Sequence, residues 1–469
     1  MKIQTKTRLK TITKKHLADT FTPVSIYLKV RDQYTESVLL ESTDFRSVEN
    51  CFSFIGIEPI ARFVAQGNDV TETFTDGTKR VQKLPNSAVL QEFKNFIVQF
   101  DTANSDPSVI NGFFGHTSYD AVQYFDTMVL DKTKRSTDLP DLHYALYRFV
   151  IAINHFKDEL TIIENLADGM TSEMDRLETI LKSQTVPTFD FVLRGDEKTN
   201  MDDDDFKKLV TIGKHHCQIG DVFQIVLARN FAQEFTGDEF QVYRALRSIN
   251  PSPYLFYFDY GTYKIFGSSP EQQLVIKNRI AGVNPIAGTY KRTGNDDDDA
   301  KSARALAADP KENAEHIMLV DLARNDLGKH CKSVKIKELR DIQFFSHVIH
   351  IVSKVEGELR DDVNPIDVFA DTFPAGTLSG APKYKAIELI DKYEKTNRHF
   401  YGGGIGFIGF NGDLTHAIVI RSFLSKDNVL YRQAGAGIVV SSVEENELQE
   451  VNNKLNALKV ALVAAEKIS

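Results

Sequence analysis

The chain has 469 residues, 42% hydrophobic and 26% charged, so it can bury a large core and has a globular composition. Its formal net charge of −9 argues against a general binder of nucleic acid or anionic membranes, and no apolar run is long enough to span a bilayer. The three cysteines form no CxxC pattern, and the basic start lacks the apolar core of a secretory signal, so we expect a cytoplasmic protein.

Residues 1–185 are expected to form an N-terminal lobe. Alternating apolar residues predict a strand over Ile26–Val30, and Val38–Leu40 begins a second short apolar run. Helical spacing predicts a helix over Val89–Phe100. A hairpin is expected from Leu146–Ile153 and Leu160–Ile163, and a helix capped by Ser172 follows. The stretch Thr185–Asn200, with Pro187, Gly195 and several charges, is interpreted as the lobe boundary.

Residues 200–465 are expected to form a catalytic domain that mixes strands and helices. The aspartate runs Asp202–Asp205 and Asp296–Asp299 each precede an apolar helical pattern, so they are interpreted as helix N-termini rather than metal sites. Strands are expected at Phe223–Leu227, Leu255–Tyr260, Leu274–Ile276, His347–Val355 and His416–Phe423, and helices at Pro365–Phe373, Lys383–Tyr393 and Glu444–Lys467. This mixture favours an α+β fold over regular βαβ units.

Two predicted helices carry paired carboxylates. Asp309–Asp326 reads as a helix capped by Asp309, with Glu312 and Glu315 on one face, and the last helix carries Glu447 and Glu450. Two such pairs can converge on one hard cation such as Mg²⁺, which takes few protein carboxylates and leaves room for an anionic substrate. For either pair alone, solvated charges on a helix surface are the favoured interpretation, since glutamate is mostly exposed.

Several shorter patterns indicate little by themselves. The GxGxxG match at Gly404–Gly409 is followed by a turn and not a helix, so we reject a dinucleotide site. His347-x-x-His350 lacks a third ligand at zinc spacing, and Gly376–Gly380 is not the GxSxG elbow of hydrolases. Anions can be bound by Lys383, Arg421 and Lys454, and by backbone N–H groups of a predicted loop at Gly435–Gly437, although Lys454 is also placed to pair with Glu450.

Four longer motifs in order are more specific than any single one. They are Pro285–Thr289, Glu315–Asp326, Gly376–Lys383 and Ala434–Ile438, and together they resemble the chorismate-utilising enzymes, most closely the large subunits of anthranilate synthase. The match is strong over residues 200–465 and looser before them, through Leu39–Ser42 and Gly115–Asp120. The resemblance implies large antiparallel β-sheets packed as a sandwich with helices outside. One departure is Ser441–Glu444, where the family often has an Asp-Ser-x-Pro-Glu run.

The resemblance also implies roles for individual residues. Chorismate is expected to bind Mg²⁺ held by the four glutamates, ammonia to attack C2, and the C4 hydroxyl to leave. Glu271 matches the general acid for that departure, and His350 the histidine tied to the elimination of pyruvate; His350 is also the candidate expected to exchange protons near neutral pH. Around the substrate, the resemblance places Gly288, Thr289, Thr377, Tyr401, Arg421, Gly435, Gly437 and Lys454. Arginine suits bidentate binding of a substrate carboxylate.

Two positions distinguish branches of the family. Water-using members carry a lysine base where this chain has Gln224, and aminodeoxychorismate synthases typically carry a lysine where it has Ala287. Both replacements point to ammonia as nucleophile and to ortho-amination. An aminodeoxychorismate synthase component and a non-catalytic tryptophan-binding module remain the alternatives.

A partner and an inhibitor are implied as well. No cysteine lies in a Gly-x-Cys-x-Gly turn, so a separate glutamine amidotransferase small subunit is expected to supply ammonia from glutamine. Segments matching the tryptophan-feedback pocket of the family comprise Leu40, Glu41, Ser42, Asn250, Pro251, Ser252, Pro253 and Tyr254. There Glu41 would pair with the ligand's ammonium and Ser42 would hydrogen-bond it.

Overall fold

The computed structural model describes residues 6–42, 51–102, 110–345 and 348–468; the Thr289 side chain also lies outside the description. Within these ranges no helix is long and apolar enough to cross a membrane. The strands are β1 Thr7–Leu17, β2 Ser37–Ser42, β3 Phe52–Gln66, β4 Asp69–Thr73, β5 Lys79–Lys83, β6 Phe100–Asp101, β7 Gly112–Thr117, β8 Leu142–Asn154, β9 Glu159–Ala167, β10 Phe191–Thr199, β11 Gln224–Gly237, β12 Tyr254–Asp259, β13 Lys264–Ser269, β14 Gln272–Lys277, β15 Ile280–Val283, β16 Ile286–Lys291, β17 Cys331–Phe344, β18 Val348–Leu359, β19 Gly380–Ala381, β20 Gly404–Gly409, β21 Leu414–Ile418, β22 Ser422–Lys426 and β23 Val429–Ile438. The helices are α1 Pro23–Val30, α2 Asn86–Ile97, α3 Val122–Phe125, α4 Met174–Lys182, α5 Asp203–Gln218, α6 Phe240–Ile249, α7 Asp296–Ala308, α8 Pro310–Gly328, α9 Pro365–Thr372, α10 Lys383–Tyr393 and α11 Glu444–Ala465, with 3₁₀ turns η2 Tyr119–Ala121, η3 Lys132–Lys134 and η4 Gly376–Leu378.

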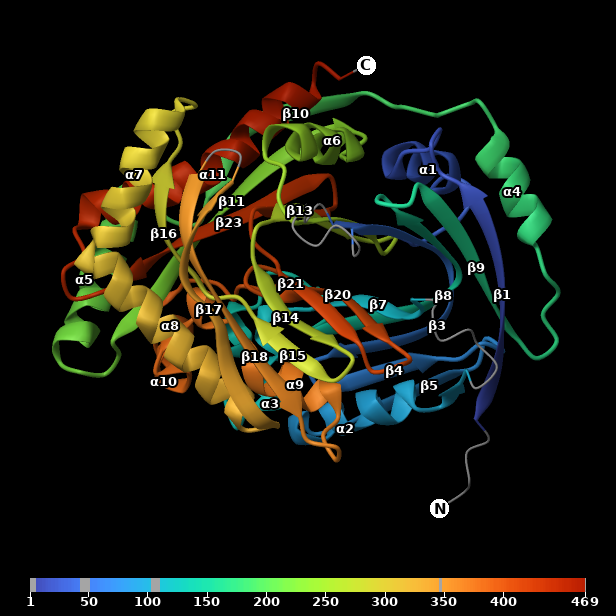
Figure 1. Cartoon of the computed structure of the whole chain (residues 1–469), viewed down its shortest axis with the longest axis horizontal. Coiled ribbons are helices and arrows are strands. Elements are labelled where there is room, and N and C mark those ends of the chain that lie inside the picture. Colours follow the sequence, from blue (N-terminus) through green and yellow to red (C-terminus); the bar gives the residue numbers. More distant parts are fainter. Residues whose placement is uncertain (1–5, 43–50, 103–109, 346–347, 469) are drawn as a thin grey trace.

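Most strands belong to one continuous antiparallel array. Pairing runs in the order β10–β11–β23–β22–β13–β12–β2–β3–β8, and then β8–β7–β20–β21–β14–β15–β18–β17. The array folds over itself, and helices lie on its outer faces (Figure 1). This agrees with the predicted α+β sandwich. The strands β2, β3, β8 and β7, all before residue 190, form one block inside the array, because β2 pairs with β12 and β7 with β20.

The strand sequences explain why the array has two covered faces. In β8 the side chains alternate, so that Tyr144 and Leu146 pack under α2 and α3 while Ala145 and Tyr147 face the core between the layers. Residues i and i+2 of a strand share a face, so a strand that is apolar on both faces must be covered on both. A third core lies beneath α1, α5, α6 and α11.

Most helix starts lie where the sequence predicts them. Asp202 caps α5 by accepting from the backbone N–H of Asp205, and Asp309 caps α8 by accepting from those of Lys311 and Glu312. The aspartates of 296–299 occupy the first turn of α7, although Asn295 is the cap. These predictions are confirmed because a side-chain acceptor and an acidic first turn stabilise a helix N-terminus whatever it packs against.

Five predictions are wrong or incomplete. Ile26–Val30 is the helix α1, opened by a capping box between Thr22 and Ser25. Ser172 makes no capping box, and residues 191–199 of the expected boundary form β10. The expected strand His416–Phe423 is split into β21 and β22, because Arg421 adopts a left-handed φ of 49°. Gly435 and Gly437 lie in β23 and pair with β11, so they form no loop.

The GxGxxG match at Gly404–Gly409 is itself the strand β20, with no helix opening at its glycines. This supports the rejection of a dinucleotide site.

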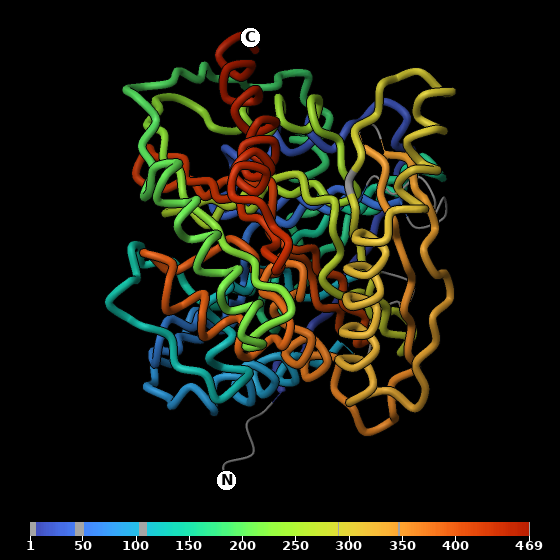
Figure 2. Tube along the Cα trace, turned by 90° about the vertical axis from the view of Figure 1, so that its left-hand side faces the viewer, coloured from blue at the N-terminus to red at the C-terminus, as the bar shows by residue number. Residues whose placement is uncertain are grey.

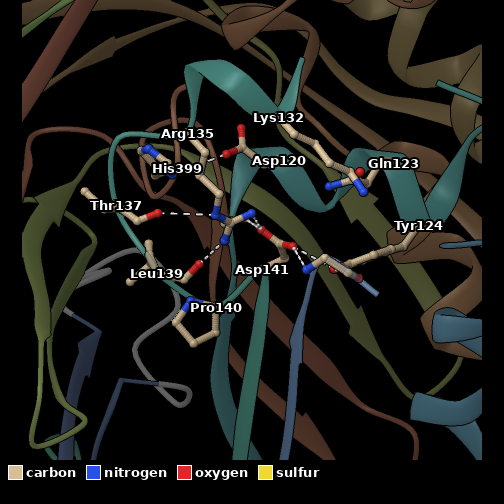
Figure 3. A network of polar contacts seen from close by, with 12 residues as sticks. Asp120, Gln123, Tyr124, Lys132, Arg135, Thr137, Leu139, Pro140, Asp141 and His399 are labelled. Atoms are coloured by element: carbon tan, nitrogen blue, oxygen red, sulfur yellow. Dashed lines mark hydrogen bonds and ion pairs between the residues drawn. The ribbon is translucent and has the colours of Figure 1, made fainter. Parts of the chain in front are cut away.

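A buried polar network fastens the 131–141 segment to the sheet. Asp141 is 1% exposed; it accepts hydrogen bonds from the Tyr124 hydroxyl (2.6 Å) and the Gly67 N–H (2.9 Å) and pairs with Arg135 at 3.1 Å (Figure 3). His399 accepts from the backbone N–H of Ser136 at 3.2 Å. Because a buried carboxylate is stable only when paired, this network fixes the register of the segment.

Candidate active site

Two helices bring the four predicted glutamates to one side of the molecule. Glu312 and Glu315 lie on α8, and Glu447 and Glu450 lie on α11. Burial raises the pKa of Glu312, Glu315 and Glu447, and neighbouring carboxylates raise it further. The four groups therefore repel one another across a shared space, which a cation would relieve.

No closed metal cage is preformed there. Among the described residues, no group of three or more His, Cys, Asp or Glu side chains is close enough to hold a metal ion. His347, the first histidine of the His347-x-x-His350 pattern considered for zinc, lies outside the described residues. The carboxylates nonetheless suit Mg²⁺, which usually keeps several waters and takes one or two carboxylates plus substrate oxygens.

Neighbouring strands connect these glutamates to the predicted substrate residues. Gln224 Nε2 on β11 donates to Glu315 Oε1 at 2.8 Å, and a Cβ at Gly437 on β23 would lie 2.4 Å from that same Nε2. A Cβ at Gly288 on β16 would lie 3.1 Å from Glu312 Oε2, and Gly288 has a left-handed φ of 67°. A larger residue at Gly288 would therefore crowd the Glu312 carboxylate, and one at Gly437 would collide with the Gln224 amide.

Glu271 is positioned as a proton donor. It lies between β13 and β14, and Thr377 of η4 donates a hydrogen bond to its Oε1 at 2.7 Å. Burial raises the pKa of Glu271 to about 7, against the opposing effects of Thr377, Lys454 and Arg421. A carboxyl group with this pKa is half protonated at neutral pH and can act as a general acid.

His350 has the opposite shift. Burial lowers its pKa to about 4, so the ring is neutral at pH 7, contrary to the expectation that it titrates there. Its Nδ1 lies 2.8 Å from the Gly288 carbonyl, which fixes Nδ1 as the protonated nitrogen. Nε2 then carries the lone pair and is the atom that can accept a proton.

Three further predicted residues supply positive charge or polarity. Lys454 pairs with Glu450 at 2.7 Å, as its spacing predicted, and also donates to the Gly435 carbonyl at 2.9 Å. Burial lowers the pKa of Arg421, and its guanidinium makes no ion pair with any residue that the structure describes. Tyr401 is 4% exposed and lies close enough to Lys454 for their charges to interact. These groups can bind an anion.

Lys383 does not contribute to an anion site. It pairs with Asp326 at 2.8 Å and donates to the Thr372 carbonyl at 2.9 Å, so its charge is already used. The backbone of Thr289 lies in β16 opposite His350, as expected for a lining residue. Gly435 and Gly437 lie in the same strand as one another, next to Lys454 and Gln224 respectively.

A cavity of about 50 Å³ extends from this cluster. Its lining includes Glu271 and Thr377, residues of β14 and α8, and Asp326. A small molecule of the size of water or ammonia fits this volume.

The sequence did not point to Arg398, which holds part of the site in place. This side chain is 1% exposed and donates to the Val226 carbonyl of β11 at 2.7 Å, to the Leu378 carbonyl of η4, and to Glu394. In the sequence, only the i,i+4 spacing of Glu394 and Arg398 indicated that the two could pair. Such charge pairs are common on exposed helices, so the spacing did not indicate a buried arginine.

The predicted tryptophan segments also meet. β2 and β12 are paired so that Ser42 lies opposite Tyr254 and Glu41 opposite Leu255. Glu41 is 1% exposed and already accepts from Arg247 Nε (2.9 Å) and Tyr243 Oη (2.5 Å), so its carboxylate is satisfied within the protein. Asn250, Pro251, Ser252 and Pro253 form the turn between α6 and β12.

The chain is similar to proteins of one family over nearly its whole length. A family model described as chorismate binding enzyme matches residues 36–460. Anthranilate synthase component 1 of Acetivibrio thermocellus is 36% identical over 97% of this chain and 96% of that protein, and that of Aquifex aeolicus is 35% identical over 96% and 94%. The structure of anthranilate synthase component I from Streptococcus pneumoniae superposes with a TM-score of 0.77 at 31% identity, covering 87% of this chain and 92% of that one.

Proposed function

The chain belongs to the family of chorismate-binding enzymes and is an enzyme that acts on chorismate; from this premise we propose that it is the aminating subunit of an anthranilate synthase. Chorismate and ammonia would give anthranilate, pyruvate and water. The atoms balance: the amine nitrogen enters at C2, the C4 hydroxyl leaves as water, and the enolpyruvyl side chain leaves as pyruvate while the ring becomes aromatic.

Gln224 is the observation that supports ammonia as the nucleophile. Its amide lies within the site, bonded to Glu315 at 2.8 Å, at the position where water-using relatives are expected to carry a lysine. An amide cannot take a proton from water at neutral pH, whereas ammonia needs no base to attack. Ala287, buried and apolar in β16, likewise offers no nucleophile for para-amination.

Mg²⁺ is the cofactor that we propose. Glu312, Glu315, Glu447 and Glu450 would hold it, directly or through water. Burial, and after it a neighbouring carboxylate, raises the pKa of Glu312, Glu315 and Glu447, and this supports the role because a bound cation would relieve both effects. When bound, the ion supplies charge neutralisation for a substrate carboxylate. Arg421 and Lys454 would bind the other carboxylate, since an uncompensated buried carboxylate costs several kcal/mol.

The protein groups then divide the proton transfers. Glu271, protonated and oriented by Thr377, would protonate the departing hydroxyl, and His350 Nε2 would accept the ring proton during elimination. This division is supported by the opposed pKa shifts of the two groups, because an acid and a base at one pH require them.

Ammonia would reach the site from a glutamine amidotransferase partner. Cys51 and Cys331 are buried and burial raises the pKa of the Cys217 thiol to about 11, so none of the three resembles an activated glutaminase nucleophile. The name component 1, carried by the relatives, is consistent with a second component.

Tryptophan inhibition is the regulatory part of the proposal. The pairing of β2 with β12 supports it by placing Ser42 and Tyr254 side by side, and the 250–253 turn supplies a rigid wall. Because Glu41 is paired with Arg247, the ligand's ammonium would have to share that carboxylate.

Product identification tests the proposed function. Purified chain with chorismate, Mg²⁺ and ammonium chloride should yield fluorescent ortho-aminobenzoate and an equal amount of pyruvate. A para-substituted aminochorismate, or isochorismate formed without nitrogen, would contradict the proposal and identify the branch instead.

A further inference from the structure

Five large apolar side chains lie exposed where several elements end together. Their exposed fractions are 58% for Ile219, 74% for Phe223, 48% for Tyr384, 55% for Val440 and 50% for Val443. They come from the end of α5, the residue before β11, the first turn of α10, the residues after β23 and the cap of α11. We call these five residues the strand-end patch.

Backbone contacts show that the strand-end patch is one surface. The Phe223 N–H donates to the Ala381 carbonyl at 2.7 Å, three residues before Tyr384. Ile225 is in register with Ile438, two residues before Val440, and Cys217 Sγ lies 3.5 Å from the Ile438 carbonyl. Figure 1 shows α5, α10 and α11 on one side of the molecule, and Figure 2 looks onto that side.

The strand-end patch adjoins the active site at two points. Phe223 precedes Gln224, whose amide touches Glu315. Tyr384 follows Lys383, whose partner Asp326 lines the same cavity as Glu271. A protein covering this surface would therefore lie beside the start of the strand that carries Gln224 and beside a residue whose partner lines the cavity.

The surroundings of the strand-end patch are those of a protein interface. Its rim carries charges of both signs, among them Asp221, Lys214, Lys385 and Glu444. Exposed aromatic side chains within a polar rim are typical of binding hot spots, whereas isolated exposed apolar residues need no explanation.

We propose that the strand-end patch is the docking surface for the glutamine-hydrolysing partner. The inference rests on the proposed function, which requires ammonia to pass from a second protein to the substrate. A second copy of this chain fits less well, because a two-fold contact through this surface would cover it in both copies and leave no place beside Gln224 for the ammonia source.

The test uses the full chain and the purified glutaminase component of the same organism. Phe223→Ala and Tyr384→Ala remove the aromatic groups, and Phe156→Ala, 55% exposed in the β8–β9 turn, is the matched control. The dissociation constant should rise about tenfold or more for the two patch variants and stay unchanged for the control. Glutamine-dependent anthranilate formation at limiting partner should fall in proportion, while ammonium-dependent formation stays at the wild-type rate.

Charge substitution provides an independent check. Val440→Asp should weaken partner binding as well, whereas Val81→Asp, 68% exposed on β5, should not. Wild-type affinity in all three patch variants would overturn the proposal. So would a chain that is dimeric by sedimentation and becomes monomeric in Val440→Asp. Ammonium-supported turnover reports on the proposed function alone and the dissociation constant on docking alone, so the two failures are distinguishable.

Discussion

Glu271 and His350 are shifted in opposite directions by the same cause. Burial disfavours the charged form of each, which keeps a proton on the carboxyl and removes one from the imidazole near pH 7. The sequence suggested histidine as the group that titrates at neutral pH, because its ordinary pKa lies there. The structure assigns that behaviour to Glu271, since the low-dielectric surroundings that set both values come from residues far apart in the chain.

The first prediction concerns the pH dependence of Glu271. Its acid form is present below about pH 7, so kcat/KM at a fixed concentration of free ammonia should fall as the pH rises through that value. By linkage, the stability contributed by the protonated group is fully present below the ordinary glutamate pKa of about 4.3 and should be lost as the pH rises from there through about 7, because the folded pKa exceeds the unfolded one. Glu271→Gln should lower kcat by roughly 10²–10⁴ and abolish the fall of kcat/KM around pH 7. The same fall in the variant would contradict the assignment of Glu271 as the acid.

The second prediction concerns the metal. Glu315→Gln and Glu450→Gln should largely abolish activity and weaken Mg²⁺ binding measured by calorimetry, because an amide is a poor Mg²⁺ ligand. Glu445→Gln is the control: it lies on the same helix with a side chain 72% exposed. Full turnover in excess EDTA would exclude a required Mg²⁺.

The third prediction separates the two chemical steps. His350→Ala should still aminate chorismate but stall the elimination of pyruvate, because the neutral ring nitrogen that accepts the proton is gone. Chromatography should then show an amino-cyclohexadiene accumulating in place of anthranilate. Anthranilate formed at the normal rate would remove His350 from the mechanism.

At the scale of elements, patterns that depend on local chemistry were predictable. The caps of α5 and α8 and the apolar stripes of α2, α10 and α11 are contained in the sequence around each helix. The helix α1 was missed because alternation over five residues fits a strand as well, and its capping box decides the matter. The break at Arg421 was unpredictable, because a left-handed non-glycine residue is held by tertiary packing.

Strand pairing explains why the site residues were predictable only through resemblance. Gly437 and Gln224 lie far apart in the chain, and their approach depends on the β11–β23 register, which no local pattern specifies. The paired carboxylates of α8 and α11 could be placed on helix faces from spacing alone, but not facing one another. Arg398 was overlooked for the same reason.

The fourth prediction concerns the paired strands β2 and β12. Ser42 hydrogen-bonding to the charged ammonium of tryptophan would contribute roughly 1.5–3 kcal/mol, so Ser42→Ala should raise the inhibitory concentration about 10- to 150-fold. Uninhibited kcat should change little, because the whole strand β12 lies between Ser42 and Ser269, which is two residues before Glu271. Tryptophan must also weaken chorismate binding by the factor by which chorismate weakens tryptophan binding. Equal tryptophan affinity with and without a saturating substrate analogue would remove the regulatory claim.

For the whole molecule, the continuous sheet bears on the proposed division into residues 1–185 and 200–465. β2 and β7 from the first part are inserted between β12 and β20 from the second, and their shared core contains Val38, Phe114 and Phe256. Backbone hydrogen bonds and apolar contacts therefore cross the boundary along whole strands. Two parts joined in this way are expected to lose their structure together.

The fifth prediction uses Asp141 to test that coupling. Asp141→Ala leaves Arg135 without its buried partner and removes the acceptor for Tyr124 and Gly67, which should cost about 3–5 kcal/mol (Figure 3). With an unfolding entropy of about 1 kcal/mol/K for a chain of this length, Tm should fall by roughly 3–5 °C. Calorimetry should show one transition that moves as a whole, even though Asp141 and the three partners it would lose, Gly67, Tyr124 and Arg135, all lie within residues 67–141. Asp138→Ala, with a side chain 74% exposed, is the control and should leave Tm nearly unchanged. If the Asp141 variant instead splits the transition, with a lower-melting part and an unshifted one, the two parts fold independently and the strand pairs between them are too weak to couple them.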